Sequence, residues 1–160
     1  MEHLWAPWRM QYVNAHKSYD ACVFCVAQTL EDGFENLIVY RGEYAFVILN
    51  RYPYNSGHLL VVPYQHIDTL EGLRPEARDE LVALATRAVS ILSGLYHPQG
   101  FNLGINLGTA AGAGIAEHLH MHAVPRWGGD TNFISIIGKT RVLPEELSET
   151  YQRLYDAWRA

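Results

Sequence analysis

The amino-acid sequence predicts an α+β fold with a mainly antiparallel sheet, one long helix packed across it and a C-terminal helix. Three observations lead to this prediction. Apolar residues recur at helical spacing over residues 75–96. Two short apolar segments are separated only by residues 41–43, as in an antiparallel hairpin. Residues 118–123 alternate between histidine and apolar side chains, which is the period of a β-strand.

Two longer helices and one short helical segment are predicted. Pro75 suits the first turn of the helix over residues 75–96, because proline is favoured at that position. The apolar stripe of this helix is typical of a face buried in the core. The second helix is predicted over residues 144–159, and the short helical segment follows the two cysteines and ends at Leu30.

The predicted strands are short apolar segments bounded by turn residues. One of them ends at Pro63 and the histidine strand ends at Pro125, because proline cannot donate a hydrogen bond to a neighbouring strand. Loops rich in glycine, proline and asparagine separate the strands. In chain order the predicted strands span residues 37–40, 44–49, 58–63, 101–107, 118–124 and 133–137.

The length and composition fit one globular domain. The chain has 160 residues, of which 49% are hydrophobic and 18% charged. We expect an N-terminal arm over residues 1–20, with Trp5 and Trp8 as aromatic anchors, and a single domain over residues 21–160. The arm is predicted to pack on the body of the domain or on a second subunit.

Charge and hydropathy argue against two classes of partner. A formal net charge of −5 is unfavourable for general binding to nucleic-acid polymers. The apolar run over residues 59–62 is too short to span a bilayer, and the first residues resemble no signal peptide. We therefore expect a cytoplasmic protein that binds neither nucleic-acid polymers nor membranes.

Three histidines share one predicted strand. In an extended chain, His118, His120 and His122 project from the same face, about 6.5–7 Å apart. A core does not favour three adjacent titratable rings, and a solvated strand face more often carries Thr, Lys or Glu. This pattern predicts an active site or a metal site.

Several motifs around these histidines resemble the histidine triad (HIT) superfamily of nucleotide hydrolases and transferases. Residues 118–124 match its signature of three histidines separated by apolar residues. Residues 50–63 are similar to its ribose-binding loop and the strand that follows. Asn106 and Gly108, with the small-residue loop after them, precede the triad as in the family.

Two further features are similar to particular branches of this superfamily. Cys22-x-x-Cys25 and His66 resemble the zinc-binding branch. Residues 4–9 and 125–133 flank the domain as in bacterial diadenosine tetraphosphate phosphorylase-like HIT proteins. The resemblance therefore covers nearly the whole chain.

The resemblance implies a catalytic role for four histidines. His120 would be the nucleophile that forms a nucleotidyl-histidine intermediate, oriented by the backbone carbonyl of His118. His122 would contact phosphate oxygens or the leaving group, and His58 would be the fourth histidine of the site. Imidazole suits this chemistry because it is largely neutral at pH 7, with an unperturbed pKa of about 6.5.

The resemblance also implies a nucleotide-binding site. The residues it assigns to ribose, nucleotide and phosphate are Asn50, Asn106, Gly112, Ala113, Gly114 and Trp127. We expect an aliphatic wall that includes Ile48 and Leu60 to hold the base; for Trp127 a dimer contact is the alternative. Many HIT hydrolases have Gln, Ser or Thr just before the triad, whereas this chain has Gly114. This difference leaves room for inorganic phosphate and favours phosphorolysis over hydrolysis. For Arg126 we expect a surface ion pair.

A structural zinc ion is the expected cofactor, and no organic cofactor is expected. By resemblance the zinc ligands are Cys22, Cys25, His66 and His118, which form a closed tetrahedral Cys2His2 site. The alternative is a pair of reduced cysteines without metal. We expect a homodimer, as is usual in the family, with a tetramer as the alternative.

The leading functional hypothesis is a nucleotidyl transferase or hydrolase that cleaves dinucleoside polyphosphates such as diadenosine tetraphosphate. One alternative is a nucleoside phosphoramidate hydrolase, and another is a nucleotide-binding sensor with incidental turnover. Direct metal catalysis at the three histidines, as in cupins, requires a glutamate after the His-x-His pair. Positions 124–127 contain none.

Overall fold

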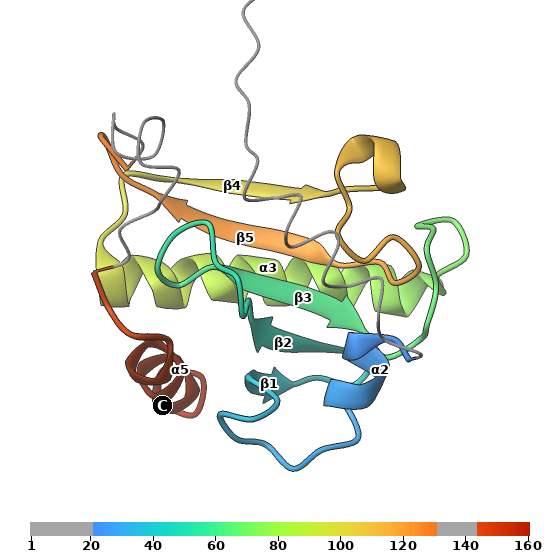
Figure 1. Cartoon of the computed structure of the whole chain (residues 1–160), viewed down its shortest axis with the longest axis horizontal. Helices are drawn as coiled ribbons and strands as arrows, with labels where there is room; N and C mark the ends of the chain where they lie inside the picture. Colours follow the sequence, from blue (N-terminus) through green and yellow to red (C-terminus); the bar gives the residue numbers. More distant parts are fainter. Residues whose placement is uncertain (1–20, 131–143) are drawn as a thin grey trace, which may run out of the picture.

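The computed structural model describes residues 21–130 and 144–160. Among these residues, five strands form one sheet in the order β1-β2-β3-β5-β4, and each neighbouring pair is antiparallel. The predicted α+β fold with an antiparallel sheet is therefore confirmed (Figure 1). The strands are β1 (Ile38–Arg41), β2 (Ala45–Leu49), β3 (Leu59–Pro63), β4 (Gly100–Ile105) and β5 (Met121–Arg126).

The described helices are α2 (Val23–Ala27), α3 (Pro75–Tyr96) and α5 (Leu147–Ala157). Helix α3 has the predicted bounds. Helix α5 begins three residues later than predicted, because the residue before it, Glu146, is extended with ψ at 151°. No helix in the described part of the chain is both long and apolar enough to cross a membrane. The predicted arm over residues 1–20 and the predicted strand over residues 133–137 lie outside the described residues.

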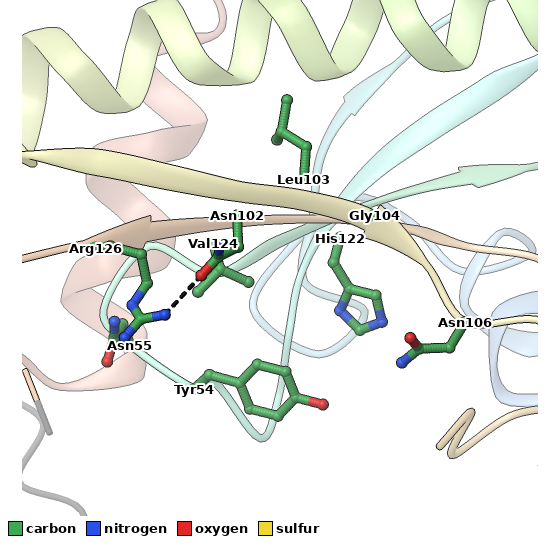
Figure 2. A pocket seen from close by; sticks show the side chains of 9 residues that line it. All are labelled: Tyr54, Asn55, Asn102, Leu103, Gly104, Asn106, His122, Val124 and Arg126. Atoms are coloured by element: carbon green, nitrogen blue, oxygen red, sulfur yellow. Dashed lines mark hydrogen bonds between the residues drawn. The ribbon is translucent and has the colours of Figure 1, made fainter. Parts of the chain in front are cut away.

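Helix α3 covers one face of the sheet and contacts β2, β3 and β5 (Figure 1). Leu59, Ala123 and Leu103 lie directly opposite one another in three neighbouring strands, so their side chains share a face. Figure 2 shows Leu103 on the side of α3. This row therefore faces the helix, and the residues one position further along each strand face away from it.

Burial decreases from the centre of the sheet to its β4 edge. Every residue of β2 and β3 is buried, which explains why these strands read as continuous apolar runs and not as an alternating pattern. Strand β4 has no buried residue, and Leu103 in its middle is 48% exposed. The sheet is thus covered around β2 and β3 and open around β4.

A carboxylate of α3 fixes the helix to the turn between β1 and β2. The two oxygens of Glu80 accept hydrogen bonds from the backbone N–H groups of Glu43, Tyr44 and Ala45. Hydrogen bonds to a charged acceptor are stronger than neutral ones. This contact sets the position of the long helix on the sheet.

The histidine strand is shifted along the chain relative to its predicted span of residues 118–124, and it ends two residues later, at Arg126. Strand β5 begins at Met121, three residues late, and it includes Pro125. The backbone N–H of Leu119 donates to the carbonyl of Ile67, a loop residue, at 2.6 Å, so the chain before β5 is bonded outside the sheet. Strand β4 accordingly ends at Ile105, which lies opposite Met121.

Candidate active site and metal centre

The site face of the sheet is the face opposite α3. His122 lies directly opposite Leu60 of β3 and Gly104 of β4, and Leu60 lies opposite Ile48 of β2. These four residues therefore form a row on the site face. Figure 2 shows His122 projecting from this face towards the loop that carries Tyr54. Ile48 and Leu60, the predicted aliphatic wall, are adjacent and buried in this row.

The hydrogen bond of His120 identifies which of its nitrogens is reactive. Its Nδ1 lies 2.8 Å from the backbone carbonyl oxygen of His118. A carbonyl can only accept, so Nδ1 carries the proton and Nε2 presents a lone pair. His120 is 5% exposed, and this burial lowers the pKa of its imidazole below the ordinary value. The hydrogen bond to the His118 carbonyl raises the pKa, but its effect is smaller than that of burial. The ring is therefore held neutral and nucleophilic at pH 7.

His58 and His122 form a hydrogen-bonded pair whose direction follows from the loop before β3. The backbone N–H of Tyr54 and the side-chain amide of Asn50 both donate to His58 Nδ1, at 3.1 and 3.2 Å. His58 Nε2 must then carry the proton, and it donates to His122 Nδ1 at 2.9 Å. A neutral His122 consequently has its own proton on Nε2.

His120 and His122 are neighbouring rings whose Nε2 atoms are in complementary states. Their ring centroids are 5.0 Å apart. One ring presents a lone pair at Nε2 and the neighbouring ring an N–H at Nε2, as derived above. A nucleophile next to a hydrogen-bond donor is the arrangement that displacement at a phosphate requires.

A pocket of about 280 Å³ opens on the outer side of His122. Figure 2 shows Asn102, Val124 and Arg126 pointing from β4 and β5 into the same space as His122, with the Tyr54 ring opposite them. Its lining residues are Tyr54, Asn55, Asn102, Leu103, Gly104, Asn106, His122, Val124 and Arg126. His120 is not among them and is more deeply buried than His122.

An ion pair closes the far end of this pocket. Arg126 donates to the carboxylate of Asp130 through Nε at 2.6 Å and Nη2 at 2.9 Å, which confirms the expected ion pair. The guanidinium holds the pKa of the Asp130 carboxyl far below its usual range. Asn55 also donates to Asp130, at 2.8 Å, and to the backbone carbonyl of Pro125 at 2.9 Å. These contacts, which we call the Asp130 clasp, tie the loop before β3 to the end of β5.

Cys22, Cys25, His66 and His118 form a compact cluster at the other end of the histidine row. Their ligand atoms all lie within 4.8 Å of one another. His118 Nε2 lies 2.9 Å from the carbonyl of Pro63 and must donate to it, so His118 Nδ1 presents its lone pair to the cluster.

The spacings within the cluster fit a tetrahedral metal ion. His118 Nδ1 lies 3.2 Å from Cys22 Sγ, 3.6 Å from Cys25 Sγ and 3.2 Å from His66 Nδ1. Zinc bonds of about 2.3 Å to sulfur and about 2.05 Å to nitrogen place N and S about 3.6 Å apart, and two nitrogens about 3.3 Å apart. The predicted ligand set is thus brought together with spacings close to those of a zinc site.

The structure places the other predicted binding residues as follows. Asn106 lines the pocket, and Asn50 bonds to His58. The loop before the triad is a tight turn in which Gly112 has a φ of 89° and the N–H of Ala113 donates to the carbonyl of Gly108. Gly114 is half-buried in the same loop. Trp127 follows β5, donates its backbone N–H to Asp130, and lies outside the pocket lining.

Sequence reasoning missed several residues around the site. Tyr54 belongs to no sequence pattern beyond the loop before β3, yet its N–H determines the His58 tautomer. Asn55 and Asp130 bond to each other across 75 positions of the chain, a contact that no local pattern reveals. The position of Asn102 could have been predicted from the sequence. Residues 102, 104 and 106 alternate with apolar residues, so Asn102 is expected on the same face of the predicted strand as Asn106.

Comparison with known proteins identifies the class to which this fold and site belong. The family model described as the HIT domain matches residues 33–129, and the chain belongs to the HIT family. It is 44% identical to the AP-4-A phosphorylase of Mycobacterium tuberculosis over 167 positions, which cover 99% of this chain and 85% of that protein. The predicted family and its phosphorylase-like branch are thereby confirmed.

Two crystal structures are similar in fold. A zinc-bound histidine triad family protein from Mycobacterium smegmatis is 30% identical, with a TM-score of 0.69 and coverage of 87% of this chain and 94% of that one. A histidine triad nucleotide-binding protein from Sulfolobus tokodaii is 28% identical, with a TM-score of 0.65 and coverage of 86% and 89%. The zinc-bound relative and the Cys2His2 cluster both indicate zinc as the metal.

Proposed function

We propose that this protein is an AP-4-A phosphorylase-like enzyme that cleaves diadenosine tetraphosphate and related dinucleoside polyphosphates at the α-phosphate. The observation that carries the proposal is a pair of neighbouring rings with fixed tautomers: His120 has its proton on Nδ1 and a lone pair on Nε2, and a neutral His122 has its proton on Nε2. The similarity to AP-4-A phosphorylase over nearly the whole chain supports this substrate class.

In the first step His120 is the nucleophile. Its Nε2 lone pair forms a bond to the α-phosphorus, and the bond between that phosphorus and the bridging oxygen breaks. The oxygen takes the electron pair and leaves as part of ATP. His122 donates a hydrogen bond from Nε2–H to that oxygen, and His58 holds His122 in the required tautomer.

In the second step an acceptor oxygen attacks the nucleotidyl-histidine. The bond between phosphorus and nitrogen breaks, and the electron pair returns to His120 Nε2. Inorganic phosphate as the acceptor yields ADP, and water yields AMP. We propose phosphate as the main acceptor, because Gly114 occupies the position before the triad where many HIT hydrolases have a polar side chain.

The pocket beyond His122 is the leaving-group side in this proposal. In-line displacement places the leaving group on the side of the phosphorus away from the nucleophile. His122 lines the pocket and its ring is a neighbour of the His120 ring, and Asn106 contributes an amide to the lining. We assign the α-phosphate to Asn106 and the turn that contains Gly112, Ala113 and Gly114.

The nucleoside is assigned to the covered side of the site face. Ile48 and Leu60 lie in the same row as His122 and supply an apolar wall for the base. Asn50 is assigned to the ribose, since its amide already bonds to His58 and lies next to the reacting centre. Trp127 is assigned to the polyphosphate side because it follows Arg126 at the pocket.

A zinc ion held by Cys22, Cys25, His66 and His118 would have a structural role. Four protein ligands leave no position for substrate, so such an ion supplies rigidity and no Lewis-acid chemistry. His118 links this cluster to the site, because its ring belongs to the cluster and its carbonyl orients His120.

We propose a homodimer formed at the β4 edge. Strand β4 ends the sheet, and Leu103 and Leu107 are 48% and 45% exposed there. An apolar strand edge of this kind is a template for pairing with a second strand. A second copy of this chain would cover it and extend the sheet.

The test is product analysis on diadenosine tetraphosphate with and without inorganic phosphate. We expect ATP and ADP with phosphate, and ATP and AMP without it. His120→Ala should lower both rates by at least about 10⁴-fold. Mass spectrometry should detect a nucleotidyl adduct only on the chain that retains His120.

A matched control is His97→Asn. His97 is exposed at the end of α3 in a left-handed conformation, with a φ of 46°, which asparagine also adopts. This variant should keep the wild-type rate. Undiminished turnover in His120→Ala would contradict the proposal, as would cleavage of nucleoside phosphoramidates alone. Tight binding of diadenosine tetraphosphate without turnover would favour the sensor.

A further inference from the structure

One aromatic ring lies between the cysteine–histidine cluster and the nucleophile. Phe24 is in the short helix α2 and is 3% exposed. Its ring centroid is 5.3 Å from the His118 ring in an edge contact, and 5.2 Å from the His120 ring. Both distances are typical of favourable aromatic contacts.

The position of Phe24 depends on the cluster. Helix α2 has only five residues, which is too short to be stable alone. Cys22 immediately precedes it, Cys25 lies within it, and both thiols face His118 Nδ1. The two cysteines therefore hold the turn of backbone from which the Phe24 ring projects.

His120 needs such a contact because its hydrogen bond alone leaves its ring plane free. The bond from Nδ1 to the His118 carbonyl fixes one atom of the ring. The direction of the Nε2 lone pair also depends on rotation of the ring, which packing against a second ring restricts. Among residues 21–130 and 144–160, the rings within contact distance are those of Phe24 and His122.

We propose that Phe24 is a positioning residue for the transfer reaction: it fixes the plane of the His120 ring and couples that plane to the cysteine–histidine cluster. The proposal rests on the proposed role of His120 as the nucleophile. Phe24 touches no reacting atom in this scheme. Its effect is to keep the Nε2 lone pair aimed at the site of the phosphorus, where a misplacement of about 1 Å costs about 100-fold in rate.

The test compares Phe24→Leu with Phe46→Leu. Phe46 is a fully buried phenylalanine of β2 that packs against Tyr64, with 5.4 Å between ring centroids, and among the described residues no ring contact joins it to a histidine. Phe24→Leu should lower the rate of nucleotidyl-enzyme formation about 10- to 100-fold, with KM changed less than about threefold. Phe46→Leu should lower the melting temperature and leave the rate unchanged.

A second measurement does not depend on activity. Nitrogen-15 spectra of the histidine rings report whether His120 keeps a single tautomer with its proton on Nδ1. We expect a mixture of tautomers or broadened signals in Phe24→Leu, and an unchanged spectrum in Phe46→Leu. Metal analysis should show the same zinc content in both variants, so the effect is assigned to the ring and not to loss of the cluster.

Three results would overturn the proposal. A rise in KM with an unchanged rate would make Phe24 a substrate contact, and an unchanged rate with an unchanged spectrum would remove any role. An equal rate loss in Phe46→Leu would reduce the effect to general destabilisation. If Phe24→Leu fails to fold, Phe24→Met keeps most of the volume and gives the same readouts. A failure of the proposed function would be seen in a different experiment, as undiminished turnover in His120→Ala.

Discussion

The two ends of the histidine triad lie in opposite surroundings. His118 is fully buried, with one ring nitrogen bonded to Pro63 and the other facing the cysteines. His122, four residues later, is half-buried, pairs with His58 and lines a pocket. Within one motif, His118 therefore belongs to the buried cysteine–histidine cluster, whereas His122 lines a pocket.

The difference shows that partners, and not the motif position alone, determine what each ring can do. Where a carbonyl accepts from Nε2, as at His118, the lone pair is at Nδ1 and faces the metal ligands. Where a carbonyl accepts from Nδ1, as at His120, the lone pair is at Nε2. Burial follows the same order, from the fully buried His118 through the 5% exposed His120 to the half-buried His122.

Of the changes that distinguish the two ends of the triad, the one with the largest expected effect is at His122. His122→Ala removes the hydrogen-bond donor from the leaving-group side, so the rate of ATP release from diadenosine tetraphosphate should fall about 10²- to 10⁴-fold. The melting temperature and the zinc content should stay close to wild type, because His122 is half-buried and outside the cluster. Rapid-quench kinetics, thermal unfolding and metal analysis on the same samples check this.

Substitution of His118, at the buried end of the triad, should change stability and metal content. His118→Ala is expected to lose metal and to unfold at a lower temperature. If His122→Ala destabilises the protein as much as His118→Ala does, the division between a structural end and a reactive end is wrong.

Removal of the metal should lower the stability of the fold. A ligand that binds only the folded protein at 100–1,000 times its Kd adds about 3–4 kcal/mol to the free energy of unfolding. Chelation should therefore lower the melting temperature by several degrees, and added zinc should restore it. In the double variant Cys22→Ser, Cys25→Ser the melting temperature should not respond to chelator, whereas a response there would place the metal elsewhere.

Much of this architecture follows from local pattern. The apolar stripe gave α3 its correct bounds, and the two-residue alternation placed His122 on the face that the pocket occupies. Cys22, Cys25 and His66 were grouped with His118 by resemblance to a family motif, and the structure brings their ligand atoms together.

Other features depend on contacts between distant segments, which a single sequence does not reveal. The start of β5 depends on the bond from Leu119 to Ile67, which takes the preceding residues out of the sheet. The direction of the His58–His122 bond depends on the Tyr54 N–H in a loop. A strand pattern contains no information about either bond, so the expected strand began three residues too early and the proton positions could not be predicted.

The smallest expected effect tests how the open end is held. Because Arg126 lowers the pKa of Asp130, the folded state binds this proton more weakly than the unfolded chain does. The stabilisation is therefore complete above the unfolded pKa of about 3.9 and is lost as the pH falls below it. Asp130→Asn should cost about 1–2 kcal/mol at pH 7. Thermal unfolding should show that the difference in unfolding free energy between wild type and Asp130→Asn decreases towards pH 3. Asp68→Asn, at an exposed carboxylate, should show no such difference at pH 7. If the difference for Asp130→Asn is the same at pH 3 as at pH 7, the negative charge of Asp130 is not what holds the loop before β3 to the end of β5.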